Sequence, residues 1–154
     1  LFDQRGGHMP ATDNRAFIGK LLLTVGTAIY TFLPPVVDIL TPTHIFHPDW
    51  VPHARFHTMW AIISASTMGL IALWMLWRKP FGEQAGVTTA ALMSSGVLGS
   101  FMVAALALPL YGGALSDPNG PPPIAEGVDA NLVTFLIALT MVLVGWRLAS
   151  RAEN

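Results

Sequence analysis

The sequence predicts an all-α integral membrane protein, a bundle of four transmembrane helices, and three observations support this. Hydrophobic residues make up 53% of the 154 residues and charged residues only 11%, whereas soluble domains carry about 25% charged residues. A helix that crosses the bilayer needs roughly 20 predominantly apolar residues. Four segments meet this requirement: 17–37, 57–77, 85–110 and 131–148. Residues 9–154 are therefore predicted to form a single four-span domain within the lipid bilayer.

Prolines and glycines in these spans indicate where helices should bend and where they should pack closely. Pro34 and Pro35 fall near the end of the first span, and Pro109 near the end of the third. Because proline lacks an N–H and clashes with the preceding turn, both helices are expected to finish with a bend. Glycines within the spans should let helices approach closely, within one chain or between chains. The spans contain Gly26, Gly69, Gly96, Gly99 and Gly145.

Lysine and arginine are distributed unevenly around the spans. Six of them flank the start of the first span and the ends of the second and fourth: Arg15, Lys20, Arg78, Lys79, Arg147 and Arg151. On the opposite side Arg55 stands alone. Because these residues favour the cytoplasmic ends of spans, both termini are expected in the cytoplasm and the loops 38–56 and 111–130 outside it. The lack of a eukaryotic targeting pattern favours a bacterial inner membrane.

Residues 1–8 are expected to be an expression remnant. The chain starts with Leu1, and residues 5–9 read Arg-Gly-Gly-His-Met, which is typical of a cloning junction. The natural chain is therefore expected to begin at Met9.

The composition excludes several functions. A net charge of −1 without a basic stripe excludes a nucleic-acid-binding protein that works by counterion release. Cysteine is absent, which excludes disulfides, thiolate metal ligands, iron–sulfur clusters and covalently attached haem. The sequence also contains no Gly-rich phosphate loop and no zinc-protease helix motif.

Four of the five histidines fall within fourteen residues, at His44, His47, His53 and His57. Histidine is the usual nitrogen ligand of zinc, copper and haem iron. Pro52 suits the first turn of a helix, so His53 and His57 are predicted to share one helical face at i and i+4. His44 and His47 are predicted to lie in an interfacial loop that Phe46 and Trp50 anchor.

Each candidate residue has a structural interpretation beside the functional one. The histidines can be hydrogen-bonded interface residues, but His57 is the best ligand candidate because it opens an apolar span and needs a partner or a metal. Arg55 can anchor a phosphate headgroup or pair with a carboxylate or haem propionate. Tyr111 can be an interfacial tyrosine or donate a hydrogen bond to a substrate oxygen.

Short motifs around these residues resemble the styrene oxide isomerase family, small bacterial membrane enzymes of four helices. The family has a Trp shortly before an Ala-Arg-x-His stretch at the start of the second helix. Here Trp50 precedes residues 54–57, which read Ala-Arg-Phe-His. The family also has a Tyr seven residues before a Pro-Asn turn, as Tyr111 is before Pro118 and Asn119.

The resemblance implies a homotrimer that holds haem b between its subunits, with His57 as the iron ligand and Arg55 and Trp50 beside the cofactor. It implies that a small hydrophobic epoxide is opened to an aldehyde by Lewis-acid catalysis, with Tyr111 orienting the oxygen. The family's active-site Asn corresponds to Ile63 here.

Three hypotheses follow from the sequence. The first is the haem-dependent isomerase just described. The second is a non-haem copper or zinc protein that uses His44, His47, His53 and His57. The third is a non-catalytic accessory subunit of a membrane complex, in which the histidine loop makes contacts only.

Overall fold

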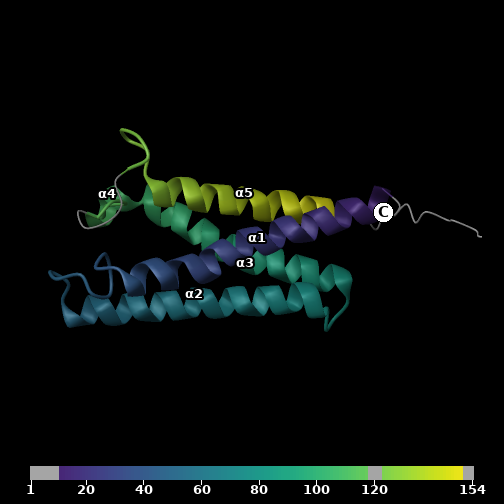
Figure 1. Ribbon diagram of the computed structural model, residues 1–154, viewed down its shortest axis with the longest axis horizontal. Coiled ribbons are helices and arrows are strands. Elements are labelled where there is room, and N and C mark those ends of the chain that lie inside the picture. Colours follow the sequence, from purple (N-terminus) through teal and green to yellow (C-terminus); the bar gives the residue numbers. More distant parts are fainter. Residues whose placement is uncertain (1–10, 118–122, 151–154) are drawn as a thin grey trace, which may run out of the picture.

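The protein is an all-α bundle in the computed structural model, which describes residues 11–117 and 123–150. Within these ranges the chain forms four long helices and one short helix (Figure 1). Their bounds are α1 Ala11–Leu40, α2 Pro52–Arg78, α3 Glu83–Leu106, α4 Leu108–Tyr111 and α5 Ala130–Ser150. The four long helices are each apolar and long enough to cross a bilayer, which confirms the predicted fold class.

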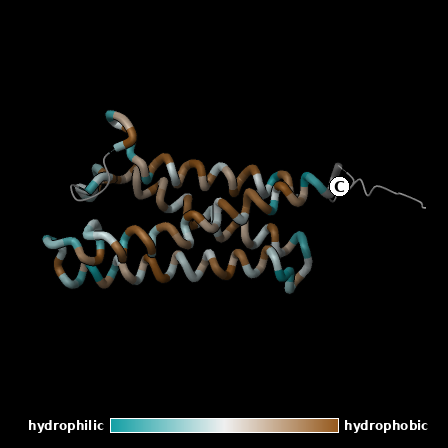
Figure 2. The backbone as a smooth tube through the Cα atoms, in the orientation of Figure 1, coloured by the Kyte–Doolittle hydropathy of each residue, from teal (hydrophilic) through white to brown (hydrophobic). Residues whose placement is uncertain are grey.

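The helices are arranged with two distinct ends. The start of α1, the α2–α3 connection and the end of α5 lie together at one end, and the α1–α2 loop and α4 lie at the other (Figure 1). We call the second end the histidine end, because it carries residues 41–57. Apolar residues predominate along the helices, and the hydrophilic residues gather at both ends (Figure 2).

Local sequence signals set the ends of the helices. Pro52 is the first residue of α2, so this helix begins five residues before the predicted span and includes both His53 and His57. Asp129 caps α5, accepting hydrogen bonds from the backbone N–H of Asn131 at 2.8 Å and of Leu132 at 3.2 Å. The predicted third span is divided at Ala107, after which Pro109 lies within the separate helix α4.

The prolines of α1 lie inside a helix that continues to Leu40. Proline at position 35 removes the N–H that would otherwise bond to the carbonyl oxygen of Thr31. The Ser66 hydroxyl of α2 donates to that oxygen instead, at 2.9 Å. The freed carbonyl is therefore satisfied by a neighbouring helix, as apolar surroundings require.

Glycines bring α1 and α5 into backbone contact. A Cβ atom built on Gly19 would lie 2.7 Å from the carbonyl oxygen of Gly145, and one on Gly145 would lie 2.6 Å from that of Gly19. The close approach predicted for Gly145 is therefore confirmed. Gly96 and Gly99, in contrast, have open space where a Cβ would lie, so they do not mediate packing within this chain.

A charged cluster joins three helices at the end opposite the histidines. Lys20 is buried and its Nζ atom lies 2.9 Å from Glu83 Oε1. The same ammonium group lies 4.7 Å from the centroid of the Trp77 ring. Lys79 also pairs with Glu83, and this hydrogen bond raises the pKa of Lys79 above its usual value. Lys20 is thus paired rather than left as an isolated charge in an apolar span.

Candidate functional site

The loop between α1 and α2 folds around the Trp50 indole. The ring of His44 meets the indole edge-on with 5.5 Å between centroids, and the ring of His47 lies 5.8 Å away. Arg55 of α2 donates from Nε to the carbonyl oxygen of Trp50 at 3.1 Å and from Nη2 to that of His47 at 3.0 Å. Arg55 therefore fastens this loop to the start of α2.

His47 connects the loop to the segment after α4. Its Nδ1 atom accepts the backbone N–H of Asp49 at 3.1 Å, and its Nε2 atom lies 3.2 Å from Asp117 Oδ2. In the neutral ring Nδ1 is then the acceptor and Nε2 carries the hydrogen, which points at the carboxylate. These contacts give His47 a structural role in joining two segments that are far apart in the sequence.

His44 belongs to a second carboxylate–histidine pair. Its Nδ1 atom lies 3.2 Å from Asp38 Oδ1 and 2.9 Å from Thr43 Oγ1. Asp38 lies near the end of α1, so the pair forms where the chain leaves that helix. Both residues line the cavity described below.

His53 and His57 form a pair of a different kind on α2. Their Nε2 atoms lie 3.0 Å apart, and their ring centroids are 4.4 Å apart. They share one face of the helix, as the i, i+4 spacing predicts, and both side chains are exposed. Phe56 and Trp60 stack beside them with 6.4 Å between centroids, and the His57 ring lies 5.6 Å from Phe56 and 6.0 Å from Trp60. The pair is thus set in an exposed aromatic surface.

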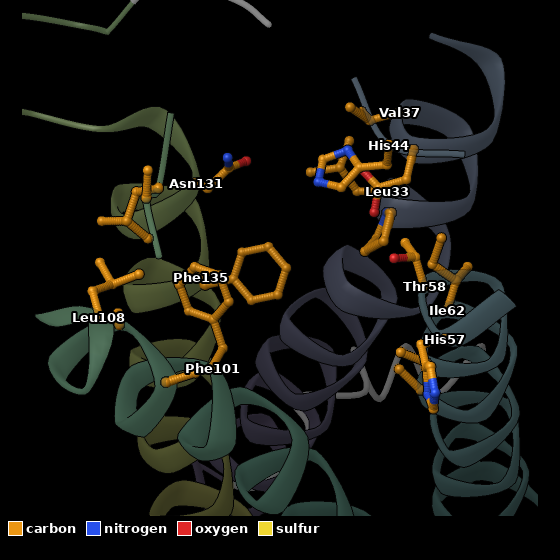
Figure 3. A pocket seen from close by; sticks show the side chains of 18 of the residues that line it. Leu33, Val37, His44, His57, Thr58, Ile62, Phe101, Leu108, Asn131 and Phe135 are labelled. Carbon is orange, nitrogen blue, oxygen red and sulfur yellow. The ribbon is translucent and has the colours of Figure 1, made fainter. Parts of the chain in front are cut away.

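A cavity of about 550 Å³ opens at the histidine end. Its floor is apolar and includes Phe101 and Phe135, whose rings stack with 4.3 Å between centroids. In Figure 3 the His44 ring projects into the cavity from one side and the Asn131 amide from the other, while the His57 ring points away from it. The remaining polar lining comes from Asp38, Thr58 and Tyr111.

Tyr111 lies at the rim of this cavity. Its hydroxyl donates to the carbonyl oxygen of Ala104 at 3.0 Å, and the side chain is largely exposed. Tyr111 and His57 both contribute to the cavity lining, so they lie at the same end of the bundle, as predicted. Pro118 and Asn119, which complete the Tyr motif, and residues 1–8 lie outside the described residues.

The structure divides the predicted site residues into two groups. His44, His47, Trp50 and Arg55 form the loop cluster, whereas His53 and His57 lie on the outer face of α2. In the part of the chain that is described, no three His, Cys, Asp or Glu side chains come together to enclose a metal ion. A site that uses all four histidines at once is therefore not formed.

From the sequence, no site role was expected for the carboxylates Asp38 and Asp117, or for Thr58 and Asn131 of the cavity. Asp38 lies six residues before His44, and a turn can bring residues with this separation together. The spacing could therefore have indicated the Asp38–His44 pair. The other three become neighbours of the site only through the packing of separate helices.

Comparison of the chain with protein-family models, curated proteins and solved structures finds no match. The resemblance to the styrene oxide isomerase family therefore rests on the short motifs around Trp50, His57 and Tyr111.

Proposed function

We propose that the protein is a haem-binding membrane isomerase that carries haem b at His57 and opens a small hydrophobic epoxide. The observation that carries this proposal is the position of His57. Its imidazole lies on an exposed aromatic face of α2, and the residue also borders the cavity that contains Tyr111. Imidazole nitrogen is the usual axial ligand of haem iron.

The residues around His57 fit such a group. Phe56, Trp60 and Ile63 are each more than half exposed on this face, and flat apolar surfaces of this kind suit a porphyrin. The Nε2 atom of His57 is engaged with His53, so ligation requires the His53 ring to turn aside. A group held on the outer face of one chain needs a second copy to cover its other side, which supports the homo-oligomer implied by the resemblance.

When bound at His57, ferric haem would supply a Lewis acid for opening an epoxide. The chain's own residues would position the substrate. The Tyr111 hydroxyl, which is 3.0 Å from the Ala104 carbonyl oxygen, would exchange that partner for the substrate oxygen and orient it.

Absorption spectroscopy of the purified protein tests the proposal. The protein, supplied with haemin, should show a Soret band, and His57→Ala should abolish it. His53→Ala is the matched control, because it removes the neighbouring imidazole and leaves the proposed ligand free; its Soret band should remain. A folded protein that takes up no haemin would contradict the proposal, as would an unchanged band in His57→Ala.

A second candidate function, copper binding, is favoured by the distance between His53 and His57. A metal ion about 2.0–2.1 Å from each of two Nε2 atoms that are 3.0 Å apart would subtend an angle of about 90–100°. This angle is closer to the tetragonal geometry of Cu(II) than to the tetrahedral geometry of Zn(II). The other ligands would be water or a second copy of the chain.

Calorimetric titration with Cu(II) separates the two candidates. Copper binding should be lost in both His53→Ala and His57→Ala, whereas the Soret band depends on His57 alone. If the protein binds neither haem nor copper and co-purifies with other chains, the accessory-subunit hypothesis gains support.

A further inference from the structure

We propose that the cavity at the histidine end binds a small apolar molecule that carries a hydroxyl group, with His44 as the hydrogen-bond acceptor. The proposal does not depend on haem or copper at His57, because it concerns a different histidine, His44, which is paired with Asp38 near the end of α1.

A chain of hydrogen bonds fixes the tautomer of the neutral His44 ring. The Thr41 hydroxyl donates to the carbonyl oxygen of Val37 at 2.6 Å. Thr41 Oγ1 must therefore be the acceptor in its 2.7 Å contact with Thr43, whose only hydroxyl hydrogen is used there. Thr43 Oγ1 is then an acceptor toward His44 Nδ1.

Asp38 presents a second acceptor to the same nitrogen, at 3.2 Å. Because both neighbours of Nδ1 are acceptors, Nδ1 carries the hydrogen in the neutral imidazole, and Nε2 is left with a free lone pair. The His44 ring extends into the cavity (Figure 3), and none of the hydrogen bonds among the described residues uses its Nε2 atom. The cavity is thus furnished with one oriented nitrogen acceptor.

The rest of the cavity indicates the kind of molecule that would use this acceptor. Its volume of about 550 Å³ and its lining of Leu33, Ile62, Phe101, Leu108 and Phe135 suit a compact apolar body, such as one aromatic ring with a short chain. The Asn131 amide faces the cavity opposite His44 (Figure 3). A hydroxyl group is suited to this pair, since it can donate to His44 and accept from an amide N–H.

A pair of ligands of equal shape tests the inference with the full-length protein in lipid nanodiscs. The probes are 4-ethylphenol and 4-ethyltoluene, in which a methyl group replaces the hydroxyl, each corrected for uptake by empty nanodiscs. The wild-type protein should bind the phenol roughly three- to tenfold more tightly, the range expected for one neutral hydrogen bond. Equal affinities for the two probes would overturn the proposal.

The variant His44→Asn removes the nitrogen that faces the cavity and keeps an amide near the place of Nδ1. The preference for the phenol should disappear, while 4-ethyltoluene still binds and reports that the cavity is intact. A preference that persists in His44→Asn would overturn the proposal, even if both affinities fall.

Nitrogen-15 NMR of histidine-labelled wild-type protein provides a test that needs no folded variant. The Nε2 resonance of neutral His44 should have the position of an unprotonated nitrogen and should shift when 4-ethylphenol is added. A protonated Nε2 in the neutral ring, or a resonance that the phenol leaves unchanged, would show that His44 is not the acceptor.

Discussion

The hydrogen bond from Ser66 to Thr31 is predicted to stabilise the bundle because Pro35 leaves the Thr31 carbonyl oxygen without a helical donor. The variant Ser66→Ala removes the hydroxyl that lies 2.9 Å from this oxygen. Interhelical hydrogen bonds in membrane proteins contribute about 0.6 kcal/mol on average and up to about 1.7 kcal/mol. Thr31 is almost fully buried, so an unsatisfied oxygen should cost roughly 1–2 kcal/mol.

The decrease in the free energy of unfolding caused by Ser66→Ala can be measured by reversible unfolding in mixed micelles, with circular dichroism reporting the helix content. Ser100→Ala is the matched control, because the Ser100 hydroxyl donates to Val97 within its own helix and is exposed. Its free energy of unfolding should change by less than about 0.5 kcal/mol.

A double-mutant cycle with Pro35→Ala tests whether the missing N–H of Pro35 is the reason that Ser66→Ala destabilises the bundle. Alanine at position 35 restores the N–H that bonds to Thr31 in a regular helix, so Ser66→Ala should lose most of its effect in that background. The reasoning is refuted if Ser66→Ala costs the same with and without Pro35, or if it costs no more than Ser100→Ala.

Three further predictions use the same unfolding measurement. Gly145→Leu should destabilise by roughly 2–3 kcal/mol, because its Cβ would lie 2.6 Å from the carbonyl oxygen of Gly19, whereas Gly96→Leu should be tolerated in open space; equal effects would contradict this. Asp129→Ala should cost about 1 kcal/mol through loss of the α5 cap, and an unchanged midpoint would show that the cap is dispensable. Glu83→Gln should cost roughly 1–3 kcal/mol, because buried Lys20 loses its carboxylate partner; a neutral result would mean that Lys20 finds another partner.

The sequence predicted the features that depend on short segments. Four apolar segments predicted four spans because span length is a property of each segment alone. The pairing of His53 with His57 followed from helical periodicity once Pro52 was assigned to the first turn.

The features that depend on packing between helices were not predictable in this way. Helix α1 continues past Pro35 because Ser66, 31 residues later, replaces the missing donor. The orientation of His44 likewise depends on its two contacts with Thr43 and Asp38, whose geometry no spacing rule specifies.

His44 and His57 belong to two separate candidate binding sites at the same end of the bundle. His44 presents a nitrogen to a cavity inside the bundle, whereas the His57 ring points to the outer face of α2 (Figure 3). A group bound at His57 would therefore be enclosed only by another molecule, while a ligand beside His44 is enclosed by this chain. Thr58, which follows His57 directly, lines the cavity, so α2 carries residues of both sites.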